Sequence, residues 1–134
     1  MSLTATEIRD ALTGIVGSDG IVTDTDTMGA WLNEPRKRFH QAAVAVVTPP
    51  NVEAVQKVMA WANQNHVGIV PQGGNTGLVG AQVPLSGKEV ILSLHKLDRI
   101  RSIDTAAGVM TAEAGVILEN AHKAAEAEGA MFPL

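Results

Sequence analysis

The chain has 134 residues, 46% hydrophobic and 18% charged, a composition typical of a globular domain or part of one rather than of a disordered segment. Its net charge of −4 and its single short basic run, Arg36-Lys37-Arg38, exclude the broad basic face that nucleic-acid binding requires. The absence of cysteine excludes disulfides and zinc–thiolate sites, and no apolar run approaches the ~20 residues that span a bilayer. Because the N-terminus lacks a signal-peptide pattern, we expect a cytoplasmic protein without a membrane span.

Local patterns predict alternating helices and strands along the first half of the chain. The expected elements are a helix from Thr4 to Gly17, a short strand at 21–23, one helical turn within the ambiguous stretch 24–33, a strand at 43–47, a helix from Asn51 and a strand at 67–71. The strand at 43–47 is continuously apolar, as in a strand buried on both faces of a parallel sheet. Strand, helix and strand from 43 to 71 therefore predict a parallel β–α–β unit. The apolar face of its helix comprises Val52, Val55, Val58, Met59 and Ala62.

A glycine-rich run follows the strand at 67–71 and is the strongest functional signal in the sequence. It comprises Pro71-Gln72-Gly73-Gly74-Asn75-Thr76-Gly77-Leu78-Val79-Gly80. Its four glycines let the backbone take positive φ and approach a ligand closely, and consecutive amides in such a loop form an anion-binding nest. We expect a pyrophosphate there, with Asn75 and Thr76 adding side-chain donors. The alternative is a plain surface loop, against which the position after a parallel strand and the apolar Leu78 and Val79 argue.

Two familiar phosphate-binding motifs do not fit this run. A P-loop needs a Lys followed by Ser or Thr, and no Lys lies between Lys57 and Lys88. A Rossmann fingerprint needs a glycine where Asn75 stands, and a helix after it, whereas the turn-rich stretch 82–87 cannot begin a helix. We therefore expect loop amides, rather than a helix N-terminus, to hold the ligand.

The pattern changes in the second half of the chain. The expected elements are short strands at 90–94, 100–104 and 109–113, a hairpin loop at 105–108, and a helix to about 128 that Gly129 ends, with Ile117, Ala121 and Ala124 on its apolar face. The predicted fold class is α/β (α+β), with a small parallel β–α–β subdomain over about residues 1–80 and the start of a mainly antiparallel subdomain over about 81–134. The apolar end at 130–134 is unlike a free terminus, so we expect an incomplete domain.

Taken in their order along the chain, the sequence motifs resemble those of the flavin-binding domain of the vanillyl-alcohol oxidase and p-cresol methylhydroxylase superfamily. The most similar branch is that of the FAD-dependent 2-hydroxy acid dehydrogenases, which includes glycolate oxidase subunits and D-lactate and D-2-hydroxyglutarate dehydrogenases. The matching residues are Val46-Val47-Thr48-Pro49, Val52-Glu53-Ala54-Val55, the glycine-rich run, Leu94-His95-Lys96-Leu97-Asp98-Arg99-Ile100, Glu113-Ala114-Gly115-Val116 and Phe132-Pro133-Leu134.

The resemblance implies an FAD-binding fold of type 2 rather than a Rossmann fold. The residues it implies in cofactor binding are Pro71, Gly73, Gly74, Asn75, Thr76, Gly77, Leu78, Gly80, Gly115, Pro133 and Leu134. Members with covalent flavin often carry His in the glycine-rich loop; no His occurs between His66 and His95 here, so the resemblance implies non-covalent FAD. No catalytic residue and no metal ligand is assigned, because the substrate domain of such enzymes follows the part that this chain resembles.

Three functional hypotheses follow. The first is the FAD-binding N-terminal portion of a flavin-dependent oxidoreductase that oxidises a small-molecule 2-hydroxy acid, with little or no turnover by this chain alone. The second is a non-catalytic nucleotide-binding or subunit-docking half-domain, in which the apolar end at 130–134 contacts a partner or forms a homo-oligomer. The third is a fragment without function that folds on its β–α–β core.

Overall fold

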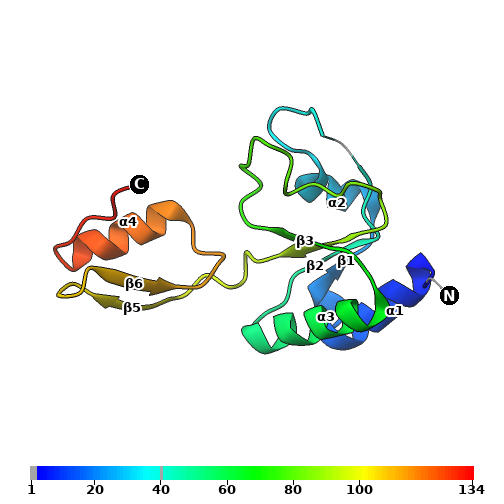
Figure 1. The fold of residues 1–134 in the computed structure, drawn as a ribbon, viewed down its shortest axis with the longest axis horizontal. Helices are drawn as coiled ribbons and strands as arrows, with labels where there is room; N and C mark the ends of the chain where they lie inside the picture. The colour runs from blue at the N-terminus through cyan, green and yellow to red at the C-terminus, as the bar shows by residue number, and fades with distance from the viewer. Residues whose placement is uncertain (1–2, 40) are drawn as a thin grey trace.

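Two sheets of different kinds carry the fold in the computed structural model, which describes residues 3–39 and 41–134 (Figure 1). The first sheet has the order β1-β2-β4-β3, in which β2, β4 and β3 run parallel and β1 is antiparallel at the edge. Its strands are β1 (Ile21–Val22), β2 (Ala45–Val47), β3 (Ile69–Gln72) and β4 (Val90–Ser93). The second sheet is the antiparallel hairpin of β5 (Ile100–Asp104) and β6 (Val109–Ala112).

Helices cover both faces of the parallel sheet. They are α1 (Ala5–Val16), α2 (Thr25–Leu32) and α3 (Val52–Asn65), with a short 3₁₀ turn, η1 (Ser18–Gly20), after α1. Figure 1 shows α1 and α3 below the sheet and α2 above it. Val46 and Ile91 pack toward α2, whereas Val47, Val90 and Leu92 pack toward α1 and α3. This alternation buries β2 and β4 completely, because each strand alternates its side chains between the two faces.

One strand prediction is wrong. We expected the strand at 90–94 to open the antiparallel part, but β4 lies between β2 and β3 and is the central strand of the parallel sheet. The physical reason lies in its burial: all four residues of β4 are buried, as in a strand covered on both faces. The parallel part therefore extends through Ser93, and the antiparallel part begins with β5.

Local signals at the helix ends are confirmed. Thr4 forms the predicted capping box with Glu7 at the start of α1, and the Asn51 side chain accepts the backbone N–H of Ala54 at 2.9 Å at the start of α3. The ambiguous stretch 24–33 forms α2, capped by Asp24. The hairpin is confirmed as β5 and β6, with Gly108 at φ 66° in its loop. The last helix, α4 (Leu118–Ala127), ends before Gly129 at φ 70°.

Three apolar residues lie outside the core positions predicted for them. On α3, Val52 and Met59 keep 45% and 44% of their surface exposed. Ile117 precedes α4 as its N-cap and is 64% exposed, so the buried face of α4 consists of Ala121 and Ala125. Among the described residues, no helix is long and apolar enough to cross a membrane.

Candidate functional site

The glycine-rich run leaves the carboxyl end of β3, directly beside the central strand. The two strands are in register with Gln72 opposite Ser93, and Leu94 donates its N–H to the carbonyl of Gln72 at 3.0 Å. Open α/β sheets bind ligands at the carboxyl ends of their strands. No helix follows: residues 73–89 consist of turns and bends, as expected for a site that is not a Rossmann fold.

The buried side chain of Gln72 ties the base of the loop to its surroundings. It is only 2% exposed, and its Nε2 donates to the carbonyl of Trp31 at 2.8 Å and to that of Gln82 at 3.0 Å. Gln82 in turn donates its Nε2 to the carbonyl of Gly77 at 2.6 Å. The loop is therefore closed on itself and attached to the last turn of α2 by buried amide groups.

Asn75 is a second attachment to the same helix end. Its Nδ2 donates to the carbonyls of Ala30, at 3.3 Å, and Asn33, at 3.0 Å, and its backbone takes a left-handed φ of 56°. We expected this side chain to donate to a phosphate, whereas here its donors face α2. Carbonyls in the last turn of a helix lack intrahelical partners. The Asn75 amide satisfies one of them, that of Ala30, together with the carbonyl of the C-cap residue Asn33, and so fixes the turn.

Two of the loop's glycines have an explanation in the protein's own packing. Gly80 has a left-handed φ of 80°, and a Cβ there would lie 2.6 Å from the ring of Phe39. A Cβ at Gly77 would lie 2.8 Å from Oε1 of Gln82. Packing of the loop against neighbouring side chains thus accounts for both positions.

Gly73 and Gly74 have no such explanation within the chain. A Cβ at Gly73 would meet no atom within 4 Å, and one at Gly74 would meet only Cγ2 of Thr76 at 3.9 Å. Neither residue takes a positive φ, and neither does Gly77; of the loop's four glycines, only Gly80 uses the positive φ that we expected glycine to allow. The open space over their backbone fits the close approach of an external group, which side chains at these positions would block.

The remaining loop residues of the predicted site are exposed. Pro71 at the end of β3 and Thr76 in the turn both face solvent. Leu78 and the neighbouring Val79 are apolar but 48% and 80% exposed. Exposed apolar side chains beside an open backbone turn are typical of a surface that another group covers.

Gly115, also predicted to contact the cofactor, has a structural explanation of its own. A Cβ at Gly115 would lie 1.9 Å from the carbonyl oxygen of Leu94 and 2.8 Å from that of Leu97. The Gly115 N–H donates to the same Leu97 carbonyl at 2.8 Å. The turn after β6 therefore packs directly on the segment that leaves β4, and only glycine fits.

Pro133 and Leu134, the last predicted contacts, lie beside α4 on the hairpin side of the molecule (Figure 1). Leu134 is 82% exposed, and the ring of Phe132 just before them lies 6.0 Å from that of His122 on α4. The structure does not bring these two residues to the glycine-rich loop, and their contact with a cofactor stays a prediction.

Glu34 is a contributor to the site that the sequence analysis missed. Its carboxylate is 1% exposed and accepts the backbone N–H groups of Arg36, at 2.7 Å, Arg38 and Phe39. Burial raises the pKa of Glu34, but these N–H groups and the Arg36 charge together hold its pKa below the usual value. The bonds fix the turn that presents Phe39 to Gly80, and nothing in the local sequence predicts them.

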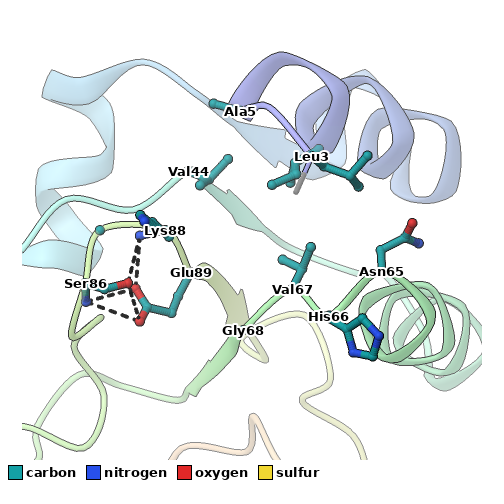
Figure 2. A pocket seen from close by; sticks show the side chains of 12 residues that line it. Leu3, Ala5, Val44, Asn65, His66, Val67, Gly68, Ser86, Lys88 and Glu89 are labelled. Atoms are coloured by element: carbon teal, nitrogen blue, oxygen red, sulfur yellow. Dashed lines mark hydrogen bonds between the residues drawn. The ribbon is translucent and has the colours of Figure 1, made fainter. Parts of the chain in front are cut away.

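A pocket of about 490 Å³ lies at the opposite, amino-terminal edge of the same sheet. Figure 2 shows its lining, in which Val44, Gly68 and Glu89 immediately precede β2, β3 and β4. The carboxylate of Glu89 accepts the backbone N–H groups of Ser86 and Lys88, so its charge is used to shape the loop. Because ligands of open α/β sheets bind at the carboxyl edge, this pocket is not our candidate site.

Comparison with known proteins identifies the family. Residues 43–134 match the FAD binding domain family. The chain belongs to that family. Its cofactor is accordingly FAD, as the sequence predicted.

Relatives extend the likeness to most of the chain. A probable mitochondrial D-2-hydroxyglutarate dehydrogenase of Oryza sativa subsp. indica is 36% identical over 120 residues, covering 90% of this chain and 21% of that protein. A putative mitochondrial D-lactate dehydrogenase of Schizosaccharomyces pombe is 37% identical over 131 residues, covering 90% and 24%. A D-2-hydroxyglutarate dehydrogenase of Stutzerimonas stutzeri is 31% identical over 132 residues, covering 98% and 28%. The chain thus spans about a fifth to somewhat over a quarter of the length of these relatives.

Solved structures share the fold. A 4-ethylphenol oxidase from Gulosibacter chungangensis superposes with a TM-score of 0.81 at 22% identity, covering 93% of this chain and 25% of that one. p-Cresol methylhydroxylase superposes with a TM-score of 0.78 at 24% identity, covering 92% and 25%. The predicted fold class, α/β of the FAD-binding type rather than a Rossmann fold, is confirmed.

Proposed function

We propose that this chain is the N-terminal, incomplete FAD-binding domain of a flavin-dependent dehydrogenase that oxidises a small-molecule 2-hydroxy acid. The observation that carries the proposal is the open backbone of Gly73 and Gly74 at the carboxyl edge of the parallel sheet, where the protein itself leaves room for a ligand. The names of the rice, fission yeast and bacterial relatives support the hydroxy-acid substrate class. Each relative is several times longer than this chain.

The chain's own residues would bind and orient the cofactor. Backbone N–H groups of residues 73–78 would hold the pyrophosphate, with Pro71, Thr76 and Leu78 beside it and Gln72 and Asn75 keeping the turn in place. The exposure of Pro71, Thr76 and Leu78 supports such contact, and no His between 66 and 95 offers a covalent link, which supports non-covalent FAD. When bound, the flavin supplies the hydride chemistry. We assign no catalytic residue in this chain and expect no measurable turnover by it alone.

A second candidate function rests on the exposed apolar end. Met131 and Leu134 are 83% and 82% exposed, which favours a half-domain that docks on a partner or on its own copy through residues 130–134. A monomer by sedimentation, unchanged by Met131→Ser, would contradict self-association through these residues. A cytoplasmic location stays a prediction under either function; the mitochondrial names of the rice and fission yeast relatives describe those proteins.

Thermal unfolding with and without FAD tests the proposed function. A ligand that binds only the folded state stabilises it by about 2.7 kcal/mol at a free concentration 100-fold above Kd. We expect Gly74→Val to abolish the FAD-induced shift in Tm while the unliganded Tm stays unchanged, because a Cβ there would make only an ordinary contact, 3.9 Å from Cγ2 of Thr76. Gly14→Val is the matched control, since a Cβ at Gly14 meets nothing within 4 Å and Gly14 lies on α1, away from the loop. An FAD shift that survives Gly74→Val would show that the loop is not the site.

A further inference from the structure

His95 lies two residues past the end of the central strand β4, at the same edge of the sheet as the glycine-rich turn. Ser93, the last residue of β4, is the register partner of Gln72, the last residue of β3. The segments that follow the two strands therefore begin side by side: Gly73 follows β3, and Leu94 and His95 follow β4. His95 is exposed at this edge of the sheet.

The imidazole lies on the same face of the sheet as the turn. Ile91 packs in the cluster on the α2 side, whereas Leu92 and Leu94 pack in the cluster on the α1 and α3 side. Ser93 therefore faces α2, because side chains alternate along a strand. Its Oγ lies 3.0 Å from Nδ1 of His95, which holds the ring on that face.

The glycine-rich turn lies on the α2 side as well, since Asn75 donates to the carbonyls of Ala30 and Asn33 at the end of that helix. The histidine ring and the backbone of Gly73 and Gly74 thus lie at the same edge and on the same side of the sheet, after neighbouring strands.

The contact with Ser93 leaves Nε2 as the ring's outward group. If the Ser93 hydroxyl donates to Nδ1, the neutral ring carries its proton on Nε2. If the ring is protonated, both nitrogens are donors and Ser93 accepts. In these two states His95 presents an N–H donor on Nε2, the group that an anion beside the turn requires. The neutral tautomer that donates its Nδ1–H to Ser93 would leave Nε2 as an acceptor instead.

We propose that His95 donates its Nε2–H to a phosphate group of the dinucleotide held over Gly73 and Gly74, so that β4 contributes a side-chain contact in addition to the amides of the loop. This inference rests on the proposed function. Ser93 is the positioning residue that orients the ring.

Calorimetric titration of the full chain with FAD, and with ADP as a competitor, tests the inference. His95→Asn keeps an amide near the Nδ1 position and removes the Nε2 donor; we expect the affinities for FAD and ADP to fall together by about tenfold, the typical effect of losing a hydrogen bond to a charged group. His95→Gln carries an amide to the Nε2 position and should recover most of that loss. The matched control is His66→Asn at the amino edge of the sheet (Figure 2), where the left-handed φ of 54° suits Asn and no change in affinity is expected.

The outcomes separate the two proposals. Wild-type chain that binds no FAD overturns both the proposed function and the inference. FAD binding by the wild type with equal affinity in His95→Asn overturns only the inference. A loss for FAD without any loss in competition by ADP also overturns it, because His95 would then act on the flavin ring rather than on the phosphates.

Discussion

Gly115→Ala is expected to destabilise the chain severely, for a reason that can be worked out from the structure. The added Cβ would lie 1.9 Å from the carbonyl oxygen of Leu94, whereas real Cβ atoms stay at least 3.0 Å from such atoms, so the two backbone segments must separate by more than an ångström. Overpacking costs about 1–3 kcal/mol. The separation also breaks the 2.8 Å bond from the Gly115 N–H to Leu97, worth about 1 kcal/mol. The expected loss is about 2–4 kcal/mol, or roughly 10 °C in Tm for a domain of this size.

Thermal and urea unfolding followed by far-UV circular dichroism measure this loss. Gly14→Ala is the control, because Gly14 lies in α1 with nothing within 4 Å of a Cβ. The same substitution there should stabilise the chain by about 0.5–1 kcal/mol, the helix preference of Ala over Gly. A Gly115→Ala variant as stable as the wild type, but unable to bind FAD, would refute the packing explanation and support our first expectation that Gly115 admits the cofactor.

Two further predictions concern stability at single contacts. Hydrogen bonds from Arg99, and then from Arg101, hold the pKa of Glu113 at about 2 instead of 4.5; the stability they confer is therefore complete above about pH 4.5 and lost as the pH falls toward 2. Urea unfolding between pH 2 and 7 should show Glu113→Gln less stable than wild type near neutrality, with a difference that disappears by about pH 2; a constant difference would contradict this assignment. Asn51→Ala removes the N-cap that accepts the Ala54 N–H and should cost about 1 kcal/mol in urea unfolding, whereas Asn51→Asp should not; equal stability of all three would contradict the cap's role.

Sequence patterns predicted what depends on neighbours in the chain. The capping box at Thr4, the N-cap at Asn51 and the hairpin at 100–112 each follow from residues a few positions apart, and all are confirmed. The order of the strands does not follow from such patterns. β4 enters between β2 and β3 through pairing across many residues, and a short apolar run fits a central parallel strand and the edge of an antiparallel sheet equally well.

In the candidate site too, the sequence predicted local features but not the contacts between distant residues. The glycine-rich run predicted where a ligand would bind, and the structure puts the run at the carboxyl edge that ligands prefer. Its supports come from elsewhere: the carboxylate of Glu34 binds three backbone N–H groups of the next turn, and Phe39 from that turn packs on Gly80. Whether one carboxylate accepts several backbone N–H groups depends on how the turn folds. Residue type and spacing do not reveal this.

Amide side chains at the base of the loop cover helix carbonyls whose partial negative charge would oppose anion binding. The last turn of α2 points unpaired carbonyls, the negative end of its dipole, toward the glycine-rich turn. Gln72 covers the Trp31 carbonyl, and Asn75 covers those of Ala30 and Asn33, each with an N–H donor. A carboxylate at either position would face these oxygens with no donor and would add charge of the wrong sign beside a pyrophosphate. The side chains that hold the turn thus also cover a helix C-terminus that, under our proposal, would otherwise repel a pyrophosphate held by the amides of Gly73 and Gly74.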